Sequence, residues 1–375
     1  MKTTILKEKL REGINVVEKI SQRFLTLPIL QNILLEAQKN LIKLSTTNLE
    51  SGIVWWGLAK VEEEGKICIP IKIFFNFLNL LPNKPLNLET LDFILNLECG
   101  NYKTKLKGFN PEDFPIIPQK KEGDFVTVDS SSFCQALNQI LNIPSISMVK
   151  PEISGIFFSF QSDLIKMVAT DSFRLAEKKL FLKTNLSREY SLILPQNAAK
   201  EIVNIFGDRE GDLNIYLSPN QIFFEALMSE IFHPQIQYTS RLIEGEYPDY
   251  QAIIPKKYET SLNLSKEEFL NQIKMASLFS GKINEVKLKI DPKVEKVEVT
   301  SQNSDLGEYK SEMGGKIQGK EVAISFNHRF LIEGILGIKS KEIIFEITNE
   351  EGPAVLKPVG AEDYFYIIMP IKSTY

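Results

Sequence analysis

The chain has 375 residues, of which 43% are hydrophobic and 25% are charged, and its formal net charge is −4. This length exceeds what one hydrophobic core usually serves, so we expect two or three domains. A net negative charge argues against a protein that grips nucleic acid by broad phosphate contact. No apolar run approaches the ~20 residues of a membrane span, and the start has no signal-peptide core. We therefore expect a soluble, cytosolic protein.

Cysteine and histidine are scarce, which limits metal and nucleophile chemistry. Cys68, Cys99 and Cys134 are far apart, and His233 and His328 are the only histidines. This spacing fits neither a disulfide framework nor a Cys-x-x-Cys zinc site. We expect buried thiols, no metal and no cofactor, and a Ser-His-Asp site is disfavoured without being excluded.

A strand followed by an amphipathic helix is predicted three times along the chain. The segments are TTILKEKLREGINVVEKI (3–20), FVTVDSSSFCQALNQIL (125–141) and SLNLSKEEFLNQIKMA (261–276). Asp129 and Ser265 are the predicted helix N-caps, and Ser265 with Glu268 has the form of a capping box.

A second strand and helix recur later in each third of the chain. They are CIPIKIFFNFLNLLP (68–82), LILPQNAAKEIVNIFGD (192–208) and AISFNHRFLIEGILG (323–337). Alternating strands follow each: LDFILNLECG (91–100), DLNIYLS (212–218) and EIIFEITNEEG (342–352).

Two related connecting segments close the first two thirds. GFNPEDFPIIPQKK (108–121) and GEYPDYQAIIPKK (245–257) share an acidic residue, an aromatic residue, Ile-Ile-Pro and a basic end. The same number of positions separates Phe114 from Tyr250 as Phe133 from Phe269. The sequence thus predicts an α+β protein of three tandem repeats, 1–121, 122–256 and 257–375, each with two helices and antiparallel sheets. Such copies can curve into an arc, and arcs with complementary ends close head to tail.

The stretch VATDSFRLA (168–176) raises a choice between two functions. Thr170-Asp171-Ser172 beside Arg174 could form a catalytic turn, or a tight bend between two strands. A hydrolase using Ser172 and Asp171 would need an oriented base, and no GxSxG elbow or phosphate loop is present. A multidomain cytosolic scaffold without a DNA role is a further alternative, although it gives no reason for paired helices.

Eight segments together resemble the bacterial DNA polymerase III beta subunit, the sliding clamp. They are TLPILQNILLEA (26–37), NLESGI (48–53), EDFPIIP (112–118), KPEISGIFFSF with VATDSFRLA, QNSDLGEYKSEM (302–313), ISFN (324–327) and YIIMPIK (366–372). The resemblance implies the DNA clamp fold and a head-to-tail homodimer that forms a closed ring around double-stranded DNA. It implies a non-catalytic processivity factor in the cytoplasm, associated with the nucleoid. The implied partners are the DNA polymerase III alpha subunit, the clamp-loader complex and other proteins with a clamp-binding motif.

A closed ring reconciles DNA binding with the negative charge, because topology rather than phosphate affinity retains it on DNA. Only the hole must be mildly positive. The resemblance makes these cations candidates for facing DNA: Lys7, Arg23, Lys72, Lys150, Lys200, Lys274 and Arg329. The loop SISMVKPEIS (145–154) lacks the aromatic and arginine residues common in the family and retains only Lys150 as a cation.

By the same resemblance, 168–176 helps to form a groove that receives an apolar peptide of partner proteins. Its candidate residues are Thr170, Ser172, Phe173, Arg174, Leu175, Pro248, Ile253, Asn327, Phe330, Val355, Ile367, Met369 and Pro370. The chain departs from the family at Ser172-Phe173, where Gly-His is common, and at Ala252, where Arg is common. The candidate dimer-interface residues are Tyr102, Thr104, Leu106, Leu278 and Phe279.

Overall fold

The computed structural model describes residues 1–20, 27–120, 123–145 and 149–372. The chain divides into two compact units. The first unit contains residues 1–135 and 183–243, and the second contains residues 136–182 and 244–375. No helix of the described residues is both long and apolar enough to cross a membrane.

The same order of elements occurs three times along the chain. Each time a strand and a helix precede several strands, and a second strand and helix precede three final strands. The first occurrence comprises β1 (Lys2–Leu6), α1 (Lys7–Val17), η1 (Pro28–Gln31), β2 (Asn32–Gln38), β3 (Leu41–Thr47), β4 (Ser51–Leu58), β5 (Lys60–Glu63), β6 (Gly65–Pro70), α2 (Ile71–Leu80), β7 (Pro85–Leu91), β8 (Ile94–Cys99), β9 (Tyr102–Lys107) and η2 (Pro111–Asp113).

The second and third occurrences follow the same plan. The second comprises β10 (Phe125–Asp129), α3 (Ser130–Asn138), η3 (Pro151–Ser154), β11 (Gly155–Phe160), β12 (Leu164–Thr170), β13 (Arg174–Phe181), β14 (Tyr190–Pro195), α4 (Gln196–Phe206), β15 (Asp212–Leu217), β16 (Gln221–Leu227), β17 (Pro234–Arg241) and η4 (Tyr250–Ile253). The third comprises β18 (Thr260–Ser265), α5 (Lys266–Ser277), β19 (Glu285–Asp291), β20 (Lys296–Asn303), β21 (Gly307–Gly314), β22 (Lys316–Gly319), β23 (Val322–Asn327), α6 (His328–Gly337), β24 (Glu342–Ile347), β25 (Ala354–Pro358) and β26 (Tyr364–Ile368).

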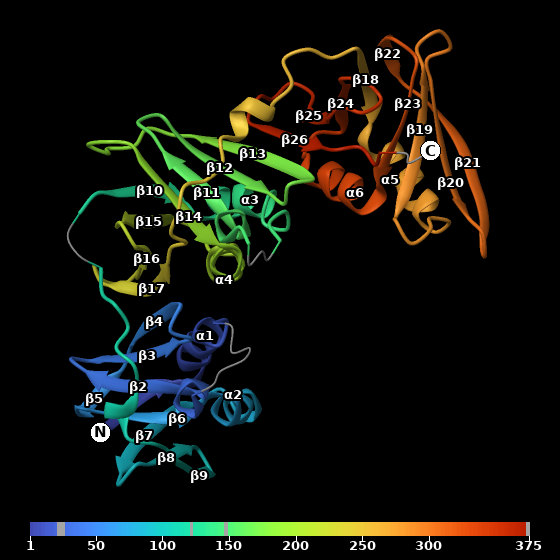
Figure 1. Ribbon diagram of the computed structural model, residues 1–375. Helices are drawn as coiled ribbons and strands as arrows, with labels where there is room; N and C mark the ends of the chain where they lie inside the picture. The colour runs from blue at the N-terminus through green and yellow to red at the C-terminus, as the bar shows by residue number, and fades with distance from the viewer. Residues whose placement is uncertain (21–26, 121–122, 146–148, 373–375) are drawn as a thin grey trace. The chain divides into compact units, whose positions relative to one another are not determined.

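Antiparallel sheets form the first unit. One sheet has the strand order β10-β15-β16-β17-β4-β3-β2-β6, and the other has the order β5-β1-β7-β8-β9. Helix α1 packs on β3 and β4 and beside α2 (Figure 1). A Cβ atom at Gly13 of α1 would lie 2.4 Å from the Trp55 ring, so glycine allows the helix to rest directly on the sheet.

The second unit repeats this arrangement with other strands. Within this unit, the strands of the large sheet have the order β11-β12-β13-β26-β25-β24-β18-β22, and the small sheet has the order β21-β20-β19-β23. Helices α5 and α6 pack against each other, and α5 also contacts β18 to β21. The apolar face of each strand and helix thereby enters a core, which accounts for the alternating pattern in the sequence.

The two predicted helix N-caps, Asp129 and Ser265, are confirmed. Asp129 Oδ1 accepts from Ser132 N at 2.8 Å, and Ser265 Oγ accepts from Glu268 N at 3.5 Å. Asn327 Oδ1 likewise accepts from Arg329 N at 3.0 Å. Each bond satisfies a backbone N–H that the first helical turn leaves without a partner.

The three cysteines are free and buried, as the sequence predicts. Burial raises the pKa of the Cys68 and Cys134 thiols to about 12, so neither is a thiolate at neutral pH. The described residues contain no cluster of three or more His, Cys, Asp or Glu that could hold a metal ion.

Candidate functional site

Residues 170–174 form a tight bend that satisfies its own polar groups. Thr170 Oγ1 donates to the Arg174 carbonyl at 2.7 Å, and Asp171 Oδ1 accepts from the backbone N–H of Phe173 and of Arg174 at 3.0 Å. Ser172 has a positive φ of 77°, a conformation that turns require and bulky residues avoid. The hydrogen bonds of the Thr170 and Asp171 side chains therefore build the turn.

The side chain of Arg174 is the centre of a buried polar network. Its Nε donates to Asp171 Oδ2 at 2.8 Å, its Nη1 donates to Glu333 Oε2 at 2.5 Å, and its Nη2 donates to the Asn142 carbonyl at 3.3 Å. The guanidinium also lies 4.3 Å from the centre of the Phe330 ring. Burial alone would lower the pKa of Arg174, but Tyr366, Asp171 and Glu333 outweigh it and raise that pKa. Arg174 therefore holds the turn against α6 as a permanent cation.

The predicted groove residues all belong to the second unit, and apart from Arg174, which is buried in the polar network, they divide into a buried group and a surface group. Leu175, Val355 and Ile367 are at most 2% exposed and form one apolar cluster with Val168 and Tyr250. The surface group comprises exposed Phe173, Ile253, Met369, Ser172 and Pro248, and half-buried Thr170, Asn327, Phe330 and Pro370.

Backbone pairing brings several of these residues together from distant parts of the chain. Leu175 pairs with Ile367, and Ile367 pairs with Val355 on its other side. Met369 N donates to the Phe173 carbonyl at 2.9 Å, which places two exposed apolar side chains on adjacent strand ends. A buried aliphatic base with exposed apolar side chains at its rim is suited to an apolar peptide.

The first unit contains a second copy of this bend that sequence analysis did not identify. Thr47 Oγ1 donates to the Ser51 carbonyl at 2.7 Å, and Asn48 Oδ1 accepts from the N–H of Glu50 and of Ser51. Leu49 has a φ of 74°, close to that of Ser172. The two bends share only Thr followed by Asn or Asp, which is too weak a signal to detect without the hydrogen bonds.

Each bend leads into a strand that pairs with the last strand of the next repeat. We call the pairing of 51–55 in β4 with 236–240 in β17 the first junction. The pairing of 174–178 in β13 with 364–368 in β26 is the second junction. Both junctions are antiparallel and start at the first residue after the bend.

Comparison with known proteins agrees with this repeated architecture. Models of the N-terminal, central and C-terminal domains of the DNA polymerase III beta subunit match residues 1–118, 127–249 and 251–372, in that order. The chain belongs to the DNA polymerase III beta subunit family.

Relatives within this family match over their whole length. The chain is 28% identical to the beta sliding clamp of Staphylococcus aureus and 27% identical to that of Staphylococcus epidermidis, with 100% of each chain covered. A sliding clamp structure from Bacillus subtilis has a TM-score of 0.93 at 24% identity, with both chains fully covered. A putative beta subunit structure from Eubacterium rectale has a TM-score of 0.92 at 26% identity, also with full coverage.

The predicted fold and function are thereby confirmed. The chain has the α+β, three-domain beta clamp fold, and it is a non-catalytic sliding clamp that confers processivity on DNA polymerase III. The Thr-Asp-Ser stretch of this clamp is therefore a structural bend, not a catalytic turn.

The candidate DNA-facing cations of the clamp differ in exposure. Lys72, Lys274 and Arg329 are exposed on α2, α5 and α6, Lys200 is half-buried on α4, and Lys150 is exposed before η3. Lys7 is only 6% exposed at the start of α1. Because so little of Lys7 is accessible, we do not retain it among the candidate DNA-facing residues. Arg23 lies outside the described residues.

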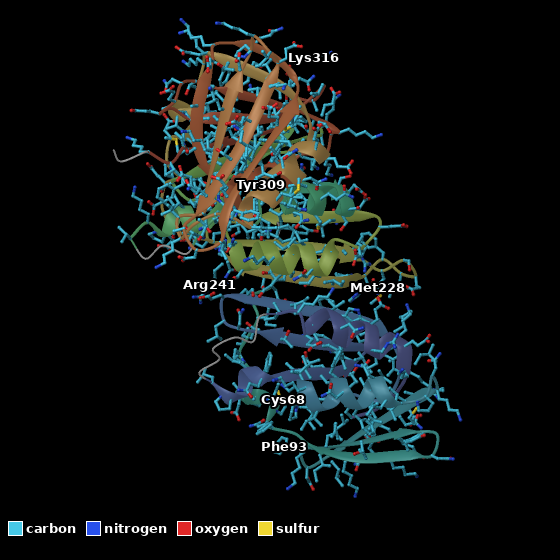
Figure 2. The ribbon with its side chains drawn as sticks, turned by 90° about the vertical axis from the view of Figure 1, so that its right-hand side faces the viewer. Cys68, Phe93, Met228, Arg241, Tyr309 and Lys316 are labelled. Carbon is cyan, nitrogen blue, oxygen red and sulfur yellow. The ribbon has the colours of Figure 1, made fainter. Side chains whose placement is uncertain are left out.

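The candidate interface residues of the clamp lie on or beside two edge strands. Tyr102, Thr104 and Leu106 lie on β9, which is at the edge of its sheet. Leu278 and Phe279 follow α5, and the Phe279 ring stacks on Tyr309 with centroids 6.2 Å apart. Tyr309 lies on the edge strand β21 (Figure 2).

Proposed function

We propose that two copies of this clamp close head to tail into a ring around duplex DNA. The observation that supports this is the repeated junction. In both junctions, the strand after the bend of one repeat pairs with the last strand of the next repeat. Their counterparts are β21 in the third repeat and β9 in the first, and among the described residues each pairs with a neighbouring strand on one side only, at the edge of its sheet.

Pairing of β21 with the β9 of a second copy would use both free edges. Unprotected edge strands favour aggregation, so a closed assembly also removes a hazard. A head-to-tail contact made twice between two identical chains closes a ring. The apolar contacts would come from Tyr102, Thr104, Leu106, Leu278 and Phe279. The positive charges of Lys105 and Lys107 on β9 would lie opposite the negative charge of Glu308 on β21.

We propose that the three clamp domains are residues 1–121, 122–256 and 257–375. Each range contains one complete occurrence of the repeated element order. The retained cations on helices, Lys72, Lys200, Lys274 and Arg329, would then face the DNA, with Lys150 nearby. Four cations on four different helices would spread weak attraction around the hole, which permits sliding.

The surface around the second junction is the proposed binding site for partner peptides. Phe173, Ile253 and Met369 would contact the peptide above the buried base of Leu175, Val355 and Ile367. The family implies DNA and a DNA polymerase as partners. We extend this to the polymerase III alpha subunit, the clamp-loader complex and other proteins with a clamp-binding motif, acting in the cytoplasm at the nucleoid.

Retention on DNA of different topology tests the ring. The protein is loaded on nicked circular DNA by its clamp loader and passed through a gel-filtration column, before and after a restriction enzyme linearises the DNA. We expect co-elution with circles and loss from linear DNA. Equal retention on both forms would show affinity without encirclement, and no retention on circles would contradict the proposal.

A further inference from the structure

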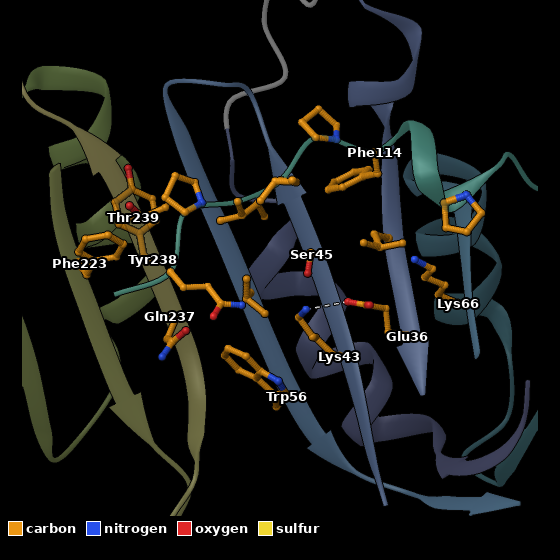
Figure 3. Close-up of a pocket in the computed structure, with 18 of the residues that line it drawn as sticks. Glu36, Lys43, Ser45, Trp56, Lys66, Phe114, Phe223, Gln237, Tyr238 and Thr239 are labelled. Atoms are coloured by element: carbon orange, nitrogen blue, oxygen red, sulfur yellow. Dashed lines mark ion pairs between the residues drawn. The ribbon is translucent and has the colours of Figure 1, made fainter. Parts of the chain in front are cut away.

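A cavity of about 300 Å³ lies in the first unit, between the outer face of the sheet and the connecting segment 111–119 (Figure 3). Leu34, Ser45 and Val54 of β2, β3 and β4 line it from the sheet, and Trp56 lines it further along β4. The volume is at the lower end of the range of ligand sites in proteins. It is distinct from the proposed peptide site, all of whose residues belong to the second unit.

One polar group in this cavity has no protein partner. Ser45 is 2% exposed, and its Oγ makes no hydrogen bond within the described part of the chain. The neighbouring Lys43 and Glu36 form an ion pair at 2.7 Å. A buried hydroxyl without a partner costs free energy, so an unsatisfied one inside a cavity points to a polar group of a ligand.

The second unit shows what occupies the corresponding place there. Ser45 pairs with Leu34 on one side and Val54 on the other, and Val168, two residues before its own bend, pairs likewise with Phe157 and Glu177. Next to Val168 lies the ring of Tyr247, stacked on Phe157 with centroids 5.1 Å apart. Its hydroxyl lies 3.5 Å from the Val168 carbonyl.

The first connecting segment has a counterpart of the Tyr250 ring but not of the Tyr247 ring. Phe114 corresponds to Tyr250, and both rings are 7% exposed. Pro111 stands three residues before Phe114 in the first connecting segment, and Tyr247 stands three residues before Tyr250 in the second. A proline ring does not reach as far as a phenol ring, and Pro111 lines the cavity that remains.

We propose that this cavity binds a phenol ring, with its hydroxyl hydrogen-bonded to Ser45 Oγ and its face against Leu34 and Trp56. The chain itself uses such a ring, that of Tyr247, at the corresponding position of its second unit. The phenol can come from a free small molecule or from a tyrosine side chain of a partner protein, since both present the same chemistry.

Tryptophan fluorescence of the full-length protein provides the test. The chain has two tryptophans, and Trp55 is fully buried whereas Trp56 lines the cavity. The probes are p-cresol and N-acetyltyrosinamide, each compared with its analogue without the hydroxyl, toluene and N-acetylphenylalaninamide. We expect each phenol to bind about fivefold more tightly than its analogue, as one net hydrogen bond allows. Ser45→Ala should abolish that difference, and Trp56→Phe should abolish the signal.

The two phenol probes, p-cresol and N-acetyltyrosinamide, also distinguish a free small molecule from a tyrosine side chain as the source of the phenol ring. Binding of both phenols supports a tyrosine carried by a peptide, whereas binding of p-cresol alone supports a free small molecule. Pro111→Tyr supplies the missing ring from within and should prevent binding of either probe. Equal affinity for phenols and their analogues in the wild-type protein, or undiminished binding by Pro111→Tyr, would overturn the proposal even if Ser45→Ala failed to fold.

Discussion

Arg174 Nη1 and Glu333 Oε2 lie 2.5 Å apart, although Arg174 begins β13 and Glu333 belongs to α6 of the next repeat. The first unit contains the same relationship with a different residue. Ser51, which begins β4, donates its Oγ to Glu201 Oε2 of α4 at 2.7 Å. Glu201 and Glu333 are each the sixth residue of their helix. A helix carboxylate thus holds the first residue of the junction strand in both units.

Arg174→Met should destabilise the second unit by about 3 kcal/mol, the cost of breaking a buried ion pair by removing one partner. The Asp171 side chain is 7% exposed, and the substitution removes the buried partner of its carboxylate. Urea unfolding measures the loss. Arg11→Met, at an exposed position on α1, is the matched control, and an equal loss in both variants would contradict the role of Arg174.

Phe173→Ala combined with Met369→Ala should weaken binding of a clamp-binding peptide by ~2 kcal/mol or more, since peptide anchors contribute about that much. Both side chains are exposed, so the free energy of unfolding should hardly change. Leu175→Ala should instead destabilise the fold by ~2–4 kcal/mol, because Leu175 is a core residue. Calorimetric titration with a peptide from the polymerase alpha subunit measures the affinity of each variant. An unchanged affinity of the double variant for the peptide would contradict the proposed binding site.

Phe279→Glu should shift the protein from dimer to monomer. The substitution places a charge in the proposed contact and removes the stacking on Tyr309. Sedimentation velocity measures the change. Phe232→Glu, at a 96% exposed position of the first unit, is the control that should remain dimeric. A Phe279→Glu protein that sediments as an intact dimer would show that the interface lies elsewhere.

Cross-linking can test which faces of the two edge strands meet. Thr104 and Leu106 point to the same face of their sheet as buried Leu97 and Leu95, with which they pair. Tyr309 points to the face covered by α5, where its hydroxyl contacts Gln272. Directly opposite residues share a face, so Tyr309→Cys should form an intermolecular disulfide with Thr104→Cys or Leu106→Cys, and not with Lys105→Cys. Cross-linking through position 105 alone would refute the alignment.

Stability should fall on mild acidification because of His328. Burial, followed by the charge of Arg329, lowers the pKa of His328 in the folded protein, and neither ring nitrogen has a partner among the described residues. The unfolded chain therefore binds the proton first, and the free energy of unfolding decreases as the pH drops below ~6.5. His328→Gln should remove this decrease in the free energy of unfolding below about pH 6.5, whereas His233→Gln should retain it. Identical pH profiles of all three proteins would exclude the effect.

Much of the fold follows from periodicity, whereas the roles of single residues do not. The helix caps at Asp129 and Ser265 were predictable because a cap depends on its immediate neighbours. Burial depends on what packs from elsewhere, so Lys7 was predicted to face DNA although the core covers it. Leu175 and Ile367 were predicted as groove residues, and pairing across the second junction makes them core residues as well. Glu333 was missed because its partner is 159 positions away.

The shared sheets affect what happens when the chain is cut. Each junction unites strands of two successive repeats in one sheet, so a repeat taken alone is not a finished module. A fragment that ends near residue 121 would retain β4 without β17. The backbone groups of 51–55 that pair with β17 would then be exposed, and Trp55 would lose its pairing with Ile236. Such fragments should therefore aggregate. The smallest fragment that folds on its own should contain both strands of a junction, together with the parts of the two successive repeats that pack on them.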